Sequence, residues 1–235
     1  MRAFVSVRGG YESQLDDDER NMIRGLASDV VLILGSDVDR ELDRRKRIAE
    51  DPFAAFEDQF MAIEQMVEQE GALDDPFGAD HSPDTLPHDL PFDDALERLL
   101  PDMSEDPELA KELRAITEES IAAAKIDHLV SMYETLTSIP DGIVDVTITN
   151  DAAPAWLAAM NDIRMVLSMR LEITDDADAE RVYERAGIFT GLNSRDDSGL
   201  PPIETQEDMM AVLYAMVTWW QESLISAVRR KSLRG

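Results

Sequence analysis

The sequence predicts a mainly α-helical domain with a small two- or three-stranded antiparallel sheet. Two observations predict the helices. Residues 155–173 and 209–226 are apolar over several helical turns, and other segments repeat apolar residues at helical spacing. A third observation predicts the sheet, because residues 1–15 and 143–149 alternate in the manner of strands. We therefore expect a helical core beside a small sheet whose strands lie far apart in the sequence.

The N-terminal segment is expected to form a hairpin followed by a helix. Residues 1–15 read as extended, and Gly9-Gly10 supplies a turn between the two halves. Asp16 with Glu19 three positions later is a variant of the capping box, so a helix should begin here. Its apolar residues recur at helical spacing, and Gly35 is a natural stop.

The middle of the chain is extreme in charge. Residues 51–110 contain 18 acidic residues and a single basic residue, Arg98, for a net charge of −17. Within this stretch, residues 71–91 combine four prolines with repeated aspartates and lack an apolar stripe, which predicts a mobile or extended connection. Residues 53–67 repeat apolar residues at helical spacing, which predicts a helix. The whole chain, residues 1–235, is interpreted as a single domain that carries this acidic segment.

The second half of the chain is expected to be mostly helical. A long helix should begin after Asp106, because Pro107 suits the first helical position, and should end near Ser138. Asn150 or Asp151 is expected to cap the apolar helix of residues 155–173. The other elements expected are a short helix at residues 93–100, a strand at residues 143–149, a helix at residues 177–186 and a last helix capped by Thr205.

The charge balance narrows the choice of partners. There are 22 Lys+Arg and 50 Asp+Glu, which gives a net charge of −28. Nucleic-acid affinity depends largely on Lys and Arg displacing counterions, so we expect no direct nucleic-acid binding, whereas basic proteins would be steered toward the chain. The longest apolar run has 12 residues, residues 209–220, where a membrane span needs about 20. We expect a cytoplasmic protein without a membrane span, as a monomer or a dimer.

The sequence contains no recognisable catalytic set, which predicts a non-enzymatic protein without a cofactor or metal. It has no cysteine, which removes thiolate nucleophiles, iron–sulfur clusters and thiolate zinc sites. Neither a Gly-x-Ser-x-Gly elbow nor a glycine-rich phosphate loop occurs. His81 and His88 lie beside aspartates, but a structural zinc site needs a full ligand set on a rigid frame. His128 is expected to be a partly exposed helix residue.

Polar residues inside the two apolar helices are the strongest site candidates. The residues concerned are Trp156, Asn161, Asp162, Arg164 and Arg170 in the first helix, and Trp219, Trp220 and Glu222 in the second. Buried polar groups are tolerated when hydrogen-bonded or paired, which favours a structural network between core helices with Glu222 as the partner of Arg164. The alternative hypothesis is a polar spot in an exposed groove that recognises a partner helix.

The run AWLAAMNDIRMVLSMRLEI follows the strand DVTIT and precedes VLYAMVTWWQESLI, and DDALERLLPD lies upstream. In this order the segments resemble the AosR-type family of actinobacterial proteins. The resemblance implies a cytoplasmic, non-enzymatic regulator of oxidative stress that acts through a redox-sensitive cysteine pair and associates with a sigma factor. Because this sequence has no cysteine, the thiol switch cannot be carried over. Oxidation of some of the 12 methionines is the alternative.

The function expected from the sequence is regulation through protein–protein interaction. A sigma factor or another part of the transcription machinery is the partner that the resemblance implies. An acidic adaptor or scaffold in protein quality control is the alternative, with the acidic segment as its handle. Co-purifying proteins distinguish the two hypotheses: polymerase and sigma subunits in the first case, protease and chaperone components in the second.

Overall fold

The computed structural model describes residues 1–51, 53, 94–187 and 203–233, and it confirms the predicted fold class. Over these residues the chain is mainly α-helical with a three-stranded antiparallel sheet. The chain divides into two compact units, residues 1–36 with 93–235 and residues 37–92. Most of the second unit lies outside the described residues, so the prediction of a single domain stays a prediction.

The sheet joins the N-terminal hairpin to a strand from the second half of the chain. β1 (Val5–Val7) and β2 (Gly10–Gln14) form the hairpin, and β3 (Asp145–Thr149) pairs with β2 to give the order β1-β2-β3. Gly9 turns the hairpin with a φ of +92°, a conformation that favours glycine. At Gly10 an added Cβ would lie 2.0 Å from the Ile148 carbonyl oxygen, so this close approach of β2 and β3 requires glycine.

Three of the described helices begin with a capping box: α1 (Asp17–Ile33), α7 (Asp176–Arg185) and α9 (Gln206–Ser232). At α1 the Asp16 carboxylate accepts from the Glu19 backbone N–H at 2.8 Å, as predicted. At α9 the Thr205 hydroxyl accepts from the Asp208 backbone N–H at 3.0 Å, which confirms the predicted cap. Local spacing in the sequence was therefore sufficient to locate these two helix starts.

Three further helices of the first unit lie close to their predicted ranges, but the N-cap predicted for one of them is wrong. α4 (Asp94–Leu99) and α5 (Pro107–Thr137) lie where the sequence predicts them. α6 (Ala153–Arg170) begins after Ala152 and has no side-chain cap, so neither Asn150 nor Asp151 caps it. The Asn150 side-chain oxygen instead accepts a hydrogen bond from Lys231 at the end of α9.

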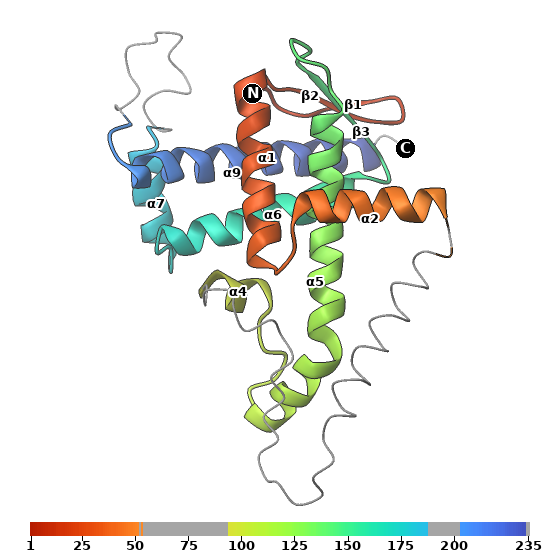
Figure 1. The fold of residues 1–235 in the computed structure, drawn as a ribbon. Helices are drawn as coiled ribbons and strands as arrows, with labels where there is room; N and C mark the ends of the chain where they lie inside the picture. Colours follow the sequence, from red (N-terminus) through yellow and green to blue (C-terminus); the bar gives the residue numbers. More distant parts are fainter. Residues whose placement is uncertain (52, 54–93, 188–202, 234–235) are drawn as a thin grey trace, which may run out of the picture. The chain divides into compact units, whose positions relative to one another are not determined.

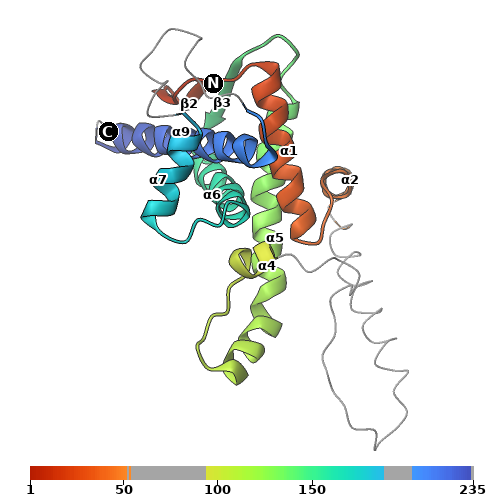
Figure 2. The ribbon, with the colours of Figure 1, turned by 90° about the vertical axis from the view of Figure 1, so that its left-hand side faces the viewer.

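α6 is the central helix of the first unit. It packs against α1, α4, α5 and α9, and α1 packs against α5 as both helices cross α6 (Figure 1, Figure 2). The residues that α6 buries include Trp156, Met160 and Ile163, each at most 1 % exposed. Polar residues on this helix must therefore be satisfied by neighbouring elements.

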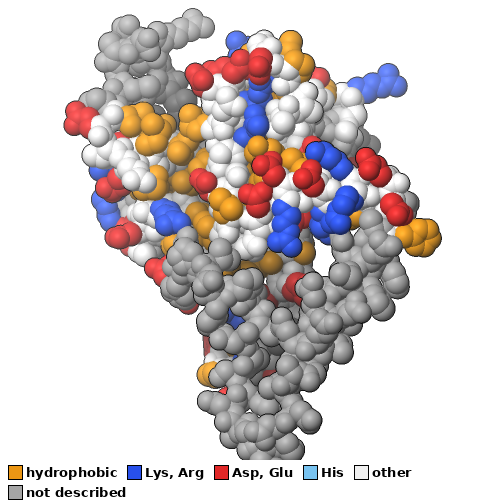
Figure 3. All heavy atoms as spheres, in the orientation of Figure 1, with side chains coloured by type: hydrophobic (Ala, Val, Ile, Leu, Met, Phe, Trp, Pro, Cys, Tyr) orange, Lys and Arg blue, Asp and Glu red, His pale blue; other side chains and the backbone are white. Residues whose placement is uncertain are grey.

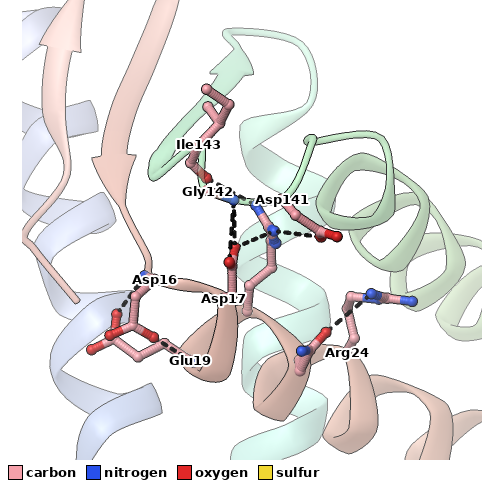
Figure 4. Close-up of polar contacts among 9 residues, drawn as sticks. Asp16, Asp17, Glu19, Arg24, Asp141, Gly142 and Ile143 are labelled. Carbon is pink, nitrogen blue, oxygen red and sulfur yellow. Dashed lines mark hydrogen bonds and ion pairs between the residues drawn. The ribbon is translucent and has the colours of Figure 1, made fainter.

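Arg20 links the start of α1 to the turn that precedes β3, and Figure 4 labels the residues that it joins, Asp17 and Ile143. Its side chain is 3 % exposed, and it donates to Asp17 Oδ1 at 2.6 Å and to the Ile143 carbonyl oxygen at 2.9 Å. Asp17 in turn accepts from the Gly142 backbone N–H at 3.1 Å. Because a buried guanidinium needs acceptors, this cluster fixes the entry of the chain into β3.

Lys231 fastens the end of α9 to the hairpin. Its ammonium donates to the carbonyl oxygens of Val7 and Gly10, both at 2.9 Å, and to Asn150 Oδ1 at 2.7 Å. The same ammonium lies 4.8 Å from the centre of the Tyr11 ring. All three ammonium protons are thereby used, which ties the last turn of α9 to the sheet.

The described part of the second unit contains α2 (Val38–Glu50). Asp37 caps it, accepting from the backbone N–H groups of Asp39 and Arg40 at 2.9 and 3.2 Å. The predicted helix at residues 53–67 and the predicted mobile connection at residues 71–91 lie outside the described residues, as do His81 and His88.

Candidate functional site

Two polar residues of α6 contact different neighbouring helices. Asp162 is bonded to Lys125 of α5, whereas Arg164 is bonded to residues of α9. Helical residues advance by about 100° each, so positions two apart leave the helix on nearly opposite sides. Asp162 and Arg164 therefore belong to separate polar contacts on either side of α6.

Asp162 is a buried carboxylate with a single cationic partner. Its side chain is 3 % exposed, and Oδ1 accepts from Lys125 Nζ at 2.5 Å, while Lys125 is 21 % exposed. Oδ2 is buried and has no hydrogen-bond partner among the described residues. Burial raises the pKa of the Asp162 carboxyl, and the hydrogen bond and charge of Lys125, with a smaller effect of His128, lower it. Burial is the larger effect, so the carboxylate is an incompletely compensated charge.

A hollow of about 350 Å³ lies between α5 and α6 next to this pair. Its polar lining consists of Ser120, Lys125, His128, Asn161 and Asp162, and its apolar lining of Ile121, Ala124 and Ala158. The hollow is thus lined by an ammonium, an imidazole, an amide and a hydroxyl, with the buried Asp162 carboxylate at its wall. Such a mixture of hydrogen-bond donors and acceptors on an apolar base suits recognition of a side chain or a small polar group.

Arg164 joins α6 to α9 through neutral acceptors. Its Nε donates to Thr218 Oγ1 at 2.9 Å and Nη1 donates to Gln221 Oε1 at 2.5 Å. Gln221 Nε2 then donates to the Leu157 carbonyl oxygen at 2.9 Å, which returns the chain of hydrogen bonds to α6. The predicted partner Glu222 is wrong: it is exposed, one position beyond Gln221 on the helix.

Trp156 and Trp220 meet in an aromatic cluster beneath the hairpin. Their ring centres lie 5.7 Å apart, and the Phe4 ring stacks on Trp220 at 4.9 Å. Trp220 Nε1 donates to Ser13 Oγ of β2 at 2.9 Å, which satisfies the one polar atom of the indole. All three rings are at most 1 % exposed, so these two tryptophans pack the core.

The remaining candidates lie apart from these contacts. Asn161 is exposed and lines the hollow, and its Nδ2 lies 3.3 Å from Met165 Sδ. Arg170 is exposed in the last turn of α6, where its charge lowers the pKa of Asp29, which burial raises more strongly. Trp219 is half-buried on α9. The structure therefore brings Asn161 and Asp162 to one hollow and separates Arg170, Trp219 and Glu222 from it.

The sequence interpretation missed the partners of both charged residues. Lys125 is 37 positions from Asp162, and Gln221 is 57 positions from Arg164. A signal for Lys125 existed, because it is a lone cation in the apolar stretch IAAAKI of α5. Gln221 carried no such signal. It is a neutral side chain that follows Trp219-Trp220 and precedes Glu222, and nothing in this stretch of sequence singles it out as a partner of an arginine.

The described residues were also searched for metal-ligand groups and for membrane-spanning helices. No group of three or more His, Asp or Glu side chains among them is arranged to hold a metal ion. No helix in the described part of the chain is long and apolar enough to cross a membrane.

Comparison with known proteins gives a family and a set of partial relatives. The chain is 33 % identical over 97 residues to proteins named oxidative stress regulator AosR from Mycobacterium bovis and from two strains of Mycobacterium tuberculosis. The match covers 35 % of this chain and 43 % of each relative, less than half of their length. No solved structure gives a significant match to the chain.

The family comparison extends over nearly the whole sequence. Residues 1–228 match the model of the domain of unknown function DUF2017. This range includes the hairpin, the central helix α6 and most of α9. Together with the matched regulators, it supports the resemblance seen in the sequence. The chain is therefore a member of the DUF2017 family.

Proposed function

We propose that this chain is a non-enzymatic regulator that acts by binding another protein. The similarity to proteins named oxidative stress regulators is the observation that carries the regulatory part. The charge of −28 supports a basic partner, because a field of this sign accelerates the encounter with a positively charged protein. The candidate residues with the largest buried surfaces, Trp156 and Trp220, are occupied in core packing, which leaves the binding role to the surface.

A sigma factor or another component of the transcription machinery is the partner that we propose. Such proteins bind DNA and carry basic surfaces, which an acidic regulator complements. The redox response of this chain, if it uses its own side chains, must proceed without thiols because the sequence has no cysteine. Oxidation of exposed methionine to the sulfoxide by peroxide is the chemistry that remains among its sulfur groups.

Affinity purification of the tagged chain from its native cells tests this function. We expect sigma and polymerase subunits to be enriched at moderate salt and to be released at high salt. A parallel purification from peroxide-treated cells shows whether oxidant changes the amount of partner recovered. Failure to enrich any protein in both samples contradicts the proposal.

An acidic adaptor in protein quality control is the second candidate. The acidic residues 51–110 are the feature that favours it, because a long charged segment offers a handle for other proteins. The same purification separates the candidates, since an adaptor enriches protease and chaperone components in place of sigma and polymerase subunits.

A further inference from the structure

The first half of α5 exposes an apolar face. Leu109 is 45 % exposed and Ile116 is 76 % exposed, and Leu113 between them is half-buried. With Ser120 these residues recur at i, i+4, i+7 and i+11, which places them on one side of the helix. In both views this half of α5 extends beyond α6 and α9 (Figure 1, Figure 2). A contiguous exposed apolar face of this kind is typical of an interaction surface.

This face continues into the hollow between α5 and α6. Ser120 and Ala124, the next residues on the same side of α5, line the hollow of about 350 Å³. At its wall lies the buried carboxylate of Asp162, with Oδ2 lacking a partner among the described residues. We define the α5 groove by Leu109, Leu113, Ile116, Ser120, Ala124 and this hollow. A partner bound along the α5 groove would contact the apolar face first and the polar lining of the hollow at its end.

Three glutamates flank the α5 groove along one side. Glu108, Glu112 and Glu119 are exposed, follow one edge of the apolar face, and form no ion pair with other described residues. The arginine on the opposite side, Arg114, is already engaged by Asp102 and Glu118. Lys111, exposed one turn after Glu108, offsets one of these charges, so the three glutamates leave this side of the groove net negative.

We infer that the α5 groove binds a basic amphipathic helix of a partner protein, an inference that rests on the proposed function. Apolar side chains of the partner helix cover Leu109 and Ile116, and its Lys and Arg side chains face the three glutamates. A second copy of this chain fits less well, because each copy carries a net charge of −28. The α5 groove thus gives the proposed partner a defined secondary structure and charge.

Titration of the purified full-length chain with synthetic peptides tests the groove. The first peptide is a helix of about 18 residues, five turns, with leucine at helical spacing and lysine on its polar face. A second peptide replaces each lysine by glutamate, and a third has the composition of the first in scrambled order. Fluorescence anisotropy of the labelled peptides gives the Kd. We expect the wild-type chain to bind the first peptide much more tightly than the other two.

Two matched pairs of variants locate the contact. Ile116→Ser should weaken binding of the first peptide by about fivefold or more, while Leu32→Ser, at a residue 49 % exposed on α1, should leave it unchanged. Neutralising Glu108, Glu112 and Glu119 together to Gln should weaken binding by about tenfold at low salt. Neutralising the exposed Glu12, Glu180 and Glu184 to Gln changes the net charge equally and should have little effect.

Several results would contradict the inference that the α5 groove binds a basic helix. No binding of the first peptide, equal binding of the scrambled peptide, or equal losses in the two glutamate triples each contradicts it. A partner recovered from native cells that binds Ile116→Ser and wild type equally also contradicts the groove and leaves the proposed function standing. An empty purification overturns the proposed function, whereas the peptide series still decides whether the groove binds a basic helix.

Discussion

Asp162 and Lys125 form an ion pair in which the two partners are unequally buried. The carboxylate is 3 % exposed and has lost most of its hydration, whereas the ammonium is 21 % exposed and keeps contact with water. The cost of burial therefore falls mainly on Asp162, and Lys125 offsets part of it. Substitutions on the two sides of the pair should consequently have different effects.

Lys125→Met should destabilise the chain more than Asp162→Asn. The first change leaves a buried carboxylate without its cation, which typically costs about 3–5 kcal/mol when a buried pair is broken. The second change removes the buried charge together with the pair, so we expect a loss of about 1 kcal/mol. Urea unfolding at neutral pH measures both values. Equal losses, or a larger loss for Asp162→Asn, would contradict this account of the pair.

The stability contributed by Asp162 should depend on pH with a defined sign. Its folded pKa is raised above the ordinary value of 3.8, so the folded state holds the proton more tightly than the unfolded state. The contribution is therefore complete below pH 3.8 and is lost as the pH rises through the folded pKa.

We expect the free energy of unfolding of wild type, minus that of Asp162→Asn, to fall as the pH rises above the ordinary carboxyl pKa of 3.8. Parallel urea titrations of the two proteins supply this difference at each pH. A difference that rises with pH would show that the Lys125 charge outweighs burial.

At the scale of elements, Arg164 holds α6 and α9 together through hydrogen bonds to Thr218 and Gln221. Arg164→Ala removes two charge-assisted hydrogen bonds and leaves Gln221 Oε1 with one partner fewer. We expect a loss of about 2–3 kcal/mol, which lowers Tm by about 5–10 °C in a chain of this size. Glu222→Ala is the matched control, because Glu222 is exposed and should leave Tm unchanged. Scanning calorimetry compares the two, and equal shifts would argue for a Glu222 contact after all.

Two glycines give opposite predictions for the same substitution. In α1, a Cβ added at Gly25 meets nothing within 4 Å, so Gly25→Ala should stabilise the chain by about 0.5–1 kcal/mol through helix propensity. In β2, a Cβ at Gly10 would lie 2.0 Å from the Ile148 carbonyl oxygen, so Gly10→Ala must separate β2 from β3. Chemical unfolding should show a gain for the first and a loss above about 2 kcal/mol for the second. Stabilisation by Gly10→Ala would contradict the register of the sheet.

Element starts could be predicted from the sequence where the signal is local. Asp16 with Glu19 and Thr205 with Asp208 are three residues apart, so each capping box is legible in a short window. The start of α6 was missed because Ala152 has no side chain that can cap. The partner of Arg164 was missed by one position, since neighbouring helical residues point about 100° apart and only tertiary packing selects Gln221 over Glu222. The hollow between α5 and α6 had no sequence signal, because residues from two helices form it.

At the scale of the whole molecule, net charge should set the response to salt. Acidic side chains are distributed over the face drawn in Figure 3, and the chain carries −28 in total. Self-repulsion at this charge destabilises the compact state, and salt screens it. We expect Tm to rise by several degrees between about 0.02 and 0.3 M NaCl at pH 7. Near the isoelectric point of about 4.2 the same addition should have little effect, and a similar rise there would contradict the repulsion argument.

The hydrogen bonds between Lys231 and the hairpin have a consequence for folding during synthesis. Val7 and Lys231 are separated by 224 positions, and the Phe4 backbone N–H donates to Ser223 across 219 positions. On the ribosome, at about 5–20 residues per second, the hairpin emerges on the order of 10–40 s before the helix that completes its packing. Until Trp220 and Ser223 emerge, the Phe4 ring lacks the indole that stacks on it and the Phe4 backbone N–H lacks its acceptor, even though β3 can already pair with β2. Phe4 and β1 therefore stay incompletely packed, and accessible to chaperones, until residues 220–231 have been made.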